Sequence, residues 1–134
     1  MTAIAGVLTG NAAADPSDRG WFVGHFMPDP DDPRATAAVE VKWAVYQGGE
    51  SRSDWSLNNA GTTLAILVRG RFHLSFPGGS VRLTREGDFA LWQPGVPHHW
   101  ATDGPTVVLT VRWPSILGDS VDVPGPETER LPGE

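Results

Sequence analysis

The chain has 134 residues, a formal net charge of −6 at neutral pH and no cysteine. This length is typical of one domain with its own core, and the lack of cysteine excludes disulfides and thiolate metal sites. The negative charge disfavours nucleic acid and anionic membranes as partners. The sequence has neither an apolar run of roughly 20 residues nor the basic start of a secretory signal, so we expect a cytoplasmic protein that has no membrane partner.

Short apolar segments alternate with turn signals along most of the chain. Segments rich in Val, Phe, Trp and Leu predict strands. These expected strands are Trp21–Phe26, Val39–Tyr46, Thr62–Val68, Arg71–Phe76, Val81–Leu83, Phe89–Trp92, His98–Ala101 and Val107–Trp113. Pairs such as Gly48-Gly49 and Pro94-Gly95 mark turns between them. Many short strands with regular turns predict an all-β, antiparallel sandwich or barrel.

The composition divides the chain into three segments. We expect an N-terminal segment over residues 1–20 and a β-domain over residues 21–113. Residues 114–134 are rich in proline and acidic residues, which predicts a surface arm or a disordered tail.

Polar and apolar residues alternate along residues 39–46, and this pattern leaves two interpretations open. Because successive strand residues face opposite ways, Glu40, Lys42 and Tyr46 share a face that is opposite a wholly apolar one. The polar face is either a solvated outer surface or the polar lining of a barrel. In the second case the Lys–Glu pair would bind an anionic or carbonyl-containing ligand. The tryptophans on apolar faces, Trp43 and Trp113, are expected in the core.

The most distinctive motif is the segment from Gly87 to Trp100, which reads GDFALWQPGVPHHW. Its two turns enclose a short apolar strand, and a Val-Pro-His sequence opens the next strand. This segment resembles the second conserved motif of the cupins. The resemblance implies that His98 reaches into a β-barrel, where the family's histidine usually binds a metal.

The first cupin motif is matched as a scaffold, from Gly49 to Gly70, without its usual ligands. Either Trp55 and Leu57, or Leu57 and Asn59, stand where the family has histidines. Thr62 or Thr63 stands where it has a glutamate. The resemblance covers roughly residues 40–113 and implies an antiparallel cupin-like barrel or jelly roll that forms a homodimer. It also implies a metal site largely lost, so the cofactor is either none or a divalent metal held by His98.

Eight residues are candidates for binding a small molecule, and His98 is the first of them. His25 lies on an expected strand, and Trp55, Trp92 and Trp100 would form an aromatic wall. Glu40, Lys42 and Tyr46 complete the set under the barrel-lining interpretation. His73 and His99 are expected at the surface.

Three functions remain open. The leading hypothesis is a cupin-type barrel that binds a small organic ligand in an aromatic-lined pocket. The second is an enzyme of the isomerase, cyclase or lyase type. It would use a metal site rebuilt from His98 and His25 with Glu40 or His73, or metal-free acid–base chemistry of His98 and Lys42. The third is a non-catalytic sensor or interaction module.

Overall fold

The computed structural model of the protein describes residues 4–14, 17–49, 51 and 54–125. Its elements follow one another as the 3-10 helix η1 (Ser17–Gly20) and the strands β1 (Trp21–Val23), β2 (Glu40–Tyr46), β3 (Trp55–Asn58), β4 (Thr62–Arg69), β5 (Phe72–Phe76), β6 (Gly79–Leu83), β7 (Phe89–Trp92), β8 (His99–Thr102), β9 (Thr106–Trp113) and β10 (Ser120–Val123). Across these residues the chain is all-β, which confirms the predicted class. None of the described helices is long and apolar enough to cross a membrane.

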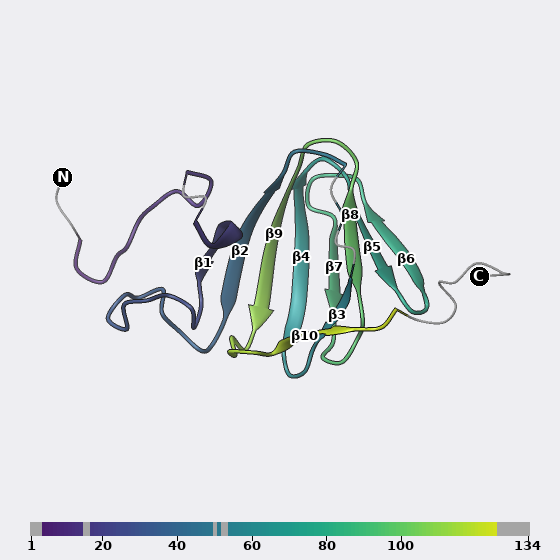
Figure 1. Ribbon diagram of the computed structural model, residues 1–134. Helices are drawn as coiled ribbons and strands as arrows, with labels where there is room; N and C mark the ends of the chain where they lie inside the picture. The colour runs from purple at the N-terminus through teal and green to yellow at the C-terminus, as the bar shows by residue number, and fades with distance from the viewer. Residues whose placement is uncertain (1–3, 15–16, 50, 52–53, 126–134) are drawn as a thin grey trace, which may run out of the picture.

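The strands form three antiparallel sheets that curl around a shared interior (Figure 1). The largest has the order β1-β2-β9-β4-β7, and a second has the order β6-β5-β8. The third pairs β3 with β10, which runs crosswise near the end of β9 (Figure 1). Neighbours in the large sheet are distant in sequence, since β2 pairs with β9 and β9 with β4. The closed arrangement therefore depends on long-range pairing.

The hydrophobic core lies between the two larger sheets, toward one end of the barrel. It consists of Ala65, Leu67, Phe72, Leu74, Leu83, Trp92 and Val108. Gly70 allows the tight passage from β4 to β5, because it has a φ of +97° and a side chain there would collide with the Pro105 carbonyl. The other end of the interior is not filled by this core.

At the cavity end, the large sheet has an apolar outer face and a polar inner face, whereas the rest of its inner face belongs to the apolar core. Val41, Trp43 and Val45 of β2 face outward, whereas Glu40 and Lys42 line the interior. The polar side of residues 39–46 is therefore the lining of the barrel and not a solvated surface. The expectation that Trp113 belongs to the core is wrong, because Trp113 is 38% exposed. Trp43, on the same outer face, is partly buried and is not a member of the core cluster.

Two strands, β3 and β10, were not expected from the sequence. Residues 120–123 leave the proposed C-terminal arm and pair with β3 from Ser120↔Asn58 to Val123↔Trp55. The sequence signal is weak because β3 is four residues long and β10 lies between Gly and Pro residues. The last part of the arm, residues 126–134, lies outside the described residues.

Candidate functional site

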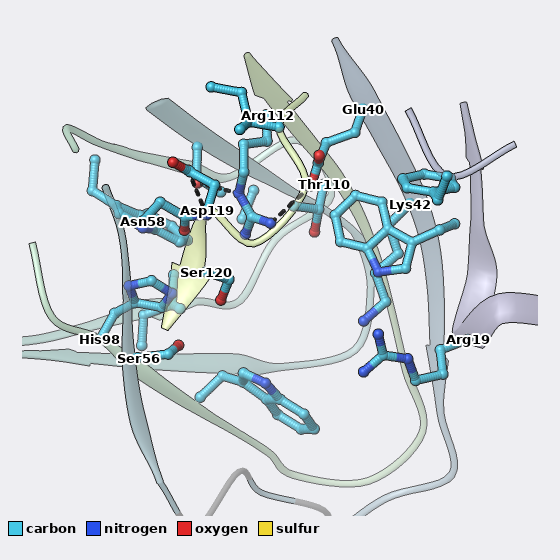
Figure 2. A pocket seen from close by; sticks show the side chains of 18 of the residues that line it. Arg19, Glu40, Lys42, Ser56, Asn58, His98, Thr110, Arg112, Asp119 and Ser120 are labelled. Carbon is cyan, nitrogen blue, oxygen red and sulfur yellow. Dashed lines mark hydrogen bonds and ion pairs between the residues drawn. The ribbon is translucent and has the colours of Figure 1, made fainter. Parts of the chain in front are cut away.

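The unfilled end of the barrel holds a cavity of about 440 Å³. This volume lies in the range of small-molecule sites, roughly 300–1,000 Å³. The cavity is lined by side chains from both larger sheets and from the β3–β10 pair, and all the predicted ligand-binding residues except Trp55 are among them. Figure 2 shows polar side chains from several strands pointing toward this space.

Trp55 does not contribute to the aromatic wall. Its ring packs against His99, with 4.4 Å between the ring centroids, and it is not among the lining residues. The alternation of side chains explains the difference, because Ser56 and Asn58 of the same strand face the cavity. The two inward residues of this motif are therefore Ser56 and Asn58, one position away from either pair considered in the sequence.

His98 is held rigidly on the cavity wall. Its backbone exchanges two hydrogen bonds with Ser56, of 2.9 and 3.0 Å, and the residue is 7% exposed. The Nδ1 atom lies 3.1 Å from the Val96 carbonyl oxygen, which can only accept, so Nδ1 donates and carries the hydrogen. In the neutral imidazole, Nε2 is therefore an acceptor. The Trp92 ring lies 4.9 Å away and limits the movement of the imidazole.

Aromatic rings form a further part of the cavity wall. The Trp100 ring lies 4.5 Å from Tyr46 and stacks at 6.0 Å on Phe72. Tyr46 in turn stacks on Phe72 at 5.9 Å. Such interlocked rings lose little side-chain freedom when a flat molecule is placed against them. The arrangement gives the cavity a preformed apolar wall.

A buried ion pair lies at the other end of the cavity. The Arg112 guanidinium donates to Glu40 Oε2 at 3.0 Å and to Thr63 Oγ1 at 2.9 Å. The two charged side chains are 14% and 9% exposed. Because desolvated charges are tolerated only when they are paired and hydrogen-bonded, this pair is a fixed part of the wall. Arg112 was not among the sequence candidates, although its position in β9 shares the parity of Thr110, another lining residue.

Glu40 also anchors a hydrogen-bonded chain that ends at His25. Ser115 donates its hydroxyl hydrogen to Glu40 Oε1 at 2.9 Å. The same hydroxyl oxygen accepts from the backbone N–H of His25 at 3.0 Å and lies 2.7 Å from its Nδ1. Since the one hydroxyl hydrogen is directed to Glu40, His25 Nδ1 is the donor in that contact. Its Nε2 is then an acceptor in the neutral ring, and the half-buried side chain lines the cavity.

Asp119 closes the cavity from the segment before β10. Its carboxylate accepts from the backbone amides of Ala60 and Gly61, at 2.8 and 3.0 Å, and from Asn58 Nδ2 at 3.2 Å. The residue is 7% exposed. The acidic composition of residues 114–134 concealed this role, because one buried aspartate cannot be distinguished from solvated ones by composition.

Two cations lie near Trp21 on the side of the cavity opposite His98. Lys42 Nζ lies 5.6 Å from the centroid of the Trp21 ring, and the Arg112 guanidinium carbon lies 5.5 Å from it. Arg19 lines the same side (Figure 2). The cavity therefore has a cationic end, an aromatic wall and a histidine end.

The described residues do not fit a metal site. Within this part of the chain no group of three or more His, Cys, Asp or Glu side chains is positioned to hold a metal ion. The Trp92 ring lies 4.9 Å from the His98 ring, and the Ser56 contact with His98 is between backbone atoms. A firmly bound divalent metal usually needs three or four protein ligands. His73, considered for a rebuilt site, pairs instead with Asp103 at 3.0 Å and is not a lining residue.

No family model matches the sequence, and no curated protein does. Solved structures do match the fold. An uncharacterized double-stranded β-helix protein from Klebsiella pneumoniae aligns over 67% of this chain and 78% of its own, with a TM-score of 0.58 and 18% identity. KdgF from Halomonas aligns over 60% and 74%, with a TM-score of 0.55 and 17% identity.

Two further matches bear on the fold. A cupin superfamily protein from Desulfitobacterium hafniense covers 58% of this chain and 69% of its own, with a TM-score of 0.52 and 22% identity. The DMSP lyase DddQ from Ruegeria pomeroyi covers 64% and 43%, with a TM-score of 0.56 and 17% identity. Together with the antiparallel sheets described above, these similarities establish that the chain has the cupin fold.

Proposed function

We propose that the barrel binds a small organic molecule in the cavity, with His98 as polar anchor and Trp100 and Trp92 as its aromatic contacts. The observation that carries this proposal is that the candidate residues come together around one cavity. Residues from β2, β7 and the β8 region, far apart in sequence, line one cavity of about 440 Å³. Core packing alone does not require a buried histidine and a buried ion pair around an open volume.

Two polar atoms near His98 strengthen the proposal. The indole Nε1 of Trp92 and the side-chain oxygen Oδ1 of Asn58 are buried and have no hydrogen-bond partner. Leaving such a group unsatisfied costs about 1–3 kcal/mol. A ligand with a hydroxyl or carbonyl group would satisfy one of them after a small side-chain shift. The His98 end is therefore suited to the polar end of a ligand.

The test is a ligand-observed NMR screen of the full chain against a small-fragment library, repeated with His98→Ala and Trp100→Ala. We expect fragments that bind the unmodified protein and bind each variant at least about tenfold more weakly. His73→Ala is the matched control, because His73 does not line the cavity. Binding that is insensitive to both cavity substitutions would reject the proposal.

Elemental analysis of untagged protein purified without chelator tests the same proposal from another direction. Near-stoichiometric Fe, Mn, Ni or Zn that disappears in His98→Ala would overturn the metal-free binding site. We expect metal well below stoichiometry in both proteins, because the described residues offer His98 no set of ligands.

A second candidate function is metal-free proton transfer, and the Glu40–Ser115–His25 chain is the observation that favours it. The chain directs the Nδ1 hydrogen of His25 toward Ser115 and leaves Nε2 as a proton acceptor on the cavity wall. A histidine oriented by a further group is the usual arrangement of a general base. An isomerase or lyase would use it to remove a proton from a bound ligand.

Deuterium exchange separates the two functions. A ligand found in the screen is incubated with the protein in D₂O, and its C–H signals are followed by NMR. Proton transfer predicts loss of one C–H signal that stops in His25→Gln while binding persists. Binding with no exchange in the unmodified protein would leave the binding function and remove the enzymatic one.

A further inference from the structure

Two buried polar atoms on the cavity wall have no hydrogen-bond partner among the described residues. They are the side-chain oxygen Oδ1 of Asn58 and the indole nitrogen Nε1 of Trp92. Asn58 is 3% exposed and Trp92 is 8% exposed, and both residues line the cavity. Because an unsatisfied buried polar group costs stability and is rare in folded proteins, these two atoms indicate which chemical group the cavity binds.

The hydrogen bonds around Asn58 decide which atom of its amide is left over. The Nδ2 atom lies 3.2 Å from Asp119 Oδ2. An ionised carboxylate can only accept, so the amide nitrogen has to be the atom that faces it. The Asp119 carboxylate is held in turn by the backbone N–H groups of Ala60 and Gly61. The Oδ1 atom of Asn58 is therefore an acceptor that points away from Asp119.

The indole of Trp92 provides a donor. Its Nε1 carries a hydrogen and cannot accept a hydrogen bond. The ring contacts Phe76, with 5.5 Å between the ring centroids, and His98, with 4.9 Å between them. Because two neighbouring rings restrict its rotation, the N–H group has a fixed direction.

Backbone contacts bring Asn58 and Trp92 to the same wall of the cavity. The N–H of Gly95, in the turn after Trp92, donates to the Asn58 carbonyl oxygen at 2.7 Å. Ser56, which lines the cavity from β3 as Asn58 does, pairs with His98. Figure 2 shows Asn58, Ser56 and His98 together on one side of the cavity, and the His98 ring contacts Trp92. The open acceptor and the open donor therefore belong to one wall.

This pair of atoms favours a neutral group that donates and accepts hydrogen bonds at once. A carbonyl, ether or carboxylate would satisfy Trp92 alone and bring a second acceptor toward Asn58 Oδ1, and an ammonium group would satisfy Asn58 alone. The Asp119 carboxylate beside Asn58 further disfavours an anion. A hydroxyl group satisfies both atoms with a single oxygen, which suits a narrow space next to two buried atoms.

We propose that Asn58 and Trp92 bind a neutral hydroxyl group of the ligand. Asn58 Oδ1 accepts the hydroxyl hydrogen, and Trp92 Nε1 donates to the hydroxyl oxygen. This inference rests on the proposed binding function and names the ligand class, an aryl alcohol or phenol. The planar body of the ligand lies against Trp100 and Tyr46, which line the same cavity.

Matched probes with one body and different polar groups test the hydroxyl site. The full chain is titrated by ligand-observed NMR with phenol, anisole and toluene, and with benzyl alcohol, benzyl methyl ether and ethylbenzene. Within each set the polar group donates and accepts, only accepts, or does neither. At least one hydroxyl probe is expected to bind about tenfold more tightly than its ether and its hydrocarbon, which corresponds to about 1.4 kcal/mol.

Two outcomes of this titration would overturn the hydroxyl site. The first is binding of an ether or hydrocarbon as tight as that of its hydroxyl probe, which would leave cavity binding itself intact. The second is the failure of both hydroxyl probes to bind. In that case the fragment screen described above still decides separately whether the cavity binds a small molecule.

Two variants assign the effect to its residues. In Asn58→Leu, affinity for the hydroxyl probe is expected to fall about fivefold to tenfold while affinity for the ether stays within about twofold, because an ether has no hydrogen to donate to Oδ1. In Trp92→Phe, affinity for both is expected to fall about fivefold, because both accept from Nε1. Hydrocarbon binding within about twofold of the unmodified protein shows that a variant is folded, since it needs only the apolar wall.

Trp43→Phe is the matched control for the indole. Its Nε1 is also buried without a partner among the described residues, but Trp43 does not line the cavity. We expect all probes to bind this variant as they bind the unmodified protein. Hydroxyl binding that is unchanged in both Asn58→Leu and Trp92→Phe would overturn the proposal, and so would an equal loss in Trp43→Phe.

The indole N–H signal of Trp92 reports the contact directly. In a ¹H–¹⁵N spectrum this signal is assigned by its absence in Trp92→Phe. Binding of the hydroxyl probe is expected to move it downfield, because a hydrogen bond deshields the donated proton, and binding of the hydrocarbon is expected not to. The Trp43 signal is expected to stay in place with both probes. No downfield movement of the Trp92 signal at saturating hydroxyl probe would overturn the proposal.

Discussion

At the cavity end of the five-stranded sheet the usual distribution of polarity is reversed, whereas at the other end the inner face is apolar and carries core residues such as Leu67 and Val108. On β2 and β9 the inner residues Glu40, Lys42 and Arg112 are polar and line the cavity, whereas their neighbours Trp43 and Leu109 face outward. In an ordinary barrel the apolar side of such strands would face the core. The difference shows that alternation in a strand identifies two faces and does not identify which one is inside.

The inner face is tolerated because its charges are paired. Arg112, Glu40 and Ser115 form one hydrogen-bonded group at distances of 2.9–3.0 Å. The outer face carries no such network. Its exposed apolar residues gain little in a single chain, because side chains such as Phe89 remain largely in water. Substitutions on the inner face should therefore cost far more stability than substitutions on the outer one.

The largest expected effect follows from breaking the inner ion pair. Arg112→Met leaves the Glu40 carboxylate buried without its charged partner, and we expect a loss of about 3–5 kcal/mol in the free energy of unfolding. The double variant Arg112→Met/Glu40→Leu is expected to lose less than the single one. Urea denaturation measures both. Arg85→Met is the control, because its ion pair with Asp88 is at the surface. Equal losses in the two arginine variants would contradict the contrast between the faces.

One leucine in the core and one on the outer face allow the contributions of the two faces of the sheet to stability to be compared. Leu67 is 1% exposed and Leu91 is 47% exposed. Leu67→Ala is expected to cost about 3 kcal/mol through lost contacts and a cavity, and Leu91→Ala less than about 1 kcal/mol at a dilution that disfavours dimers. Chemical denaturation at 1 µM gives both values. A similar cost for the two leucines would mean that the outer face is packed within one chain.

Asp119 tests the contribution of the β10 segment to the inner face. Asp119→Ala removes the acceptor of two backbone amides, at Ala60 and Gly61. We expect a loss of about 1–3 kcal/mol, measured by urea denaturation. The exposed Asp103 is the control, since its pairing with His73 is solvent-accessible and its replacement by Ala should cost less than about 1 kcal/mol. No loss in Asp119→Ala would show that the segment contributes little to the fold.

The smallest effect is expected at Asp88, outside the cavity. Backbone N–H groups of Thr84 and Arg85 donate to its carboxylate and lower the pKa of Asp88 below its usual 3.8. Because the folded-state pKa is depressed, the stabilisation is present above about pH 3.8 and is lost as the pH falls through the folded pKa. Asp88→Asn should therefore be slightly less stable at pH 7, and the difference should vanish below that range. A difference in melting temperature that persists at low pH would contradict it.

Much of the strand pattern could be predicted because β-branched and aromatic residues alternate with Gly and Pro turns. The Pro-Gly and Val-Pro turns before His98 are local, and the structure places this residue on the cavity wall. Trp55 was assigned to the cavity because one of two possible alignments of the first cupin motif placed it where the family has a histidine. A shift of one residue reverses the side-chain direction, and Ser56 and Asn58 line the cavity instead.

The sequence by itself determined the class of the fold, through turn residues and strand propensities that act over a few positions. It also determined that His98 follows a turn suited to the barrel. Only the tertiary structure decided that the face with Glu40 and Lys42 is the interior and that Asp119 closes it. The physical reason is that facing depends on which distant strands pair, here β2 with β9 and β3 with β10. Local sequence specifies a strand, and long-range pairing specifies its surroundings.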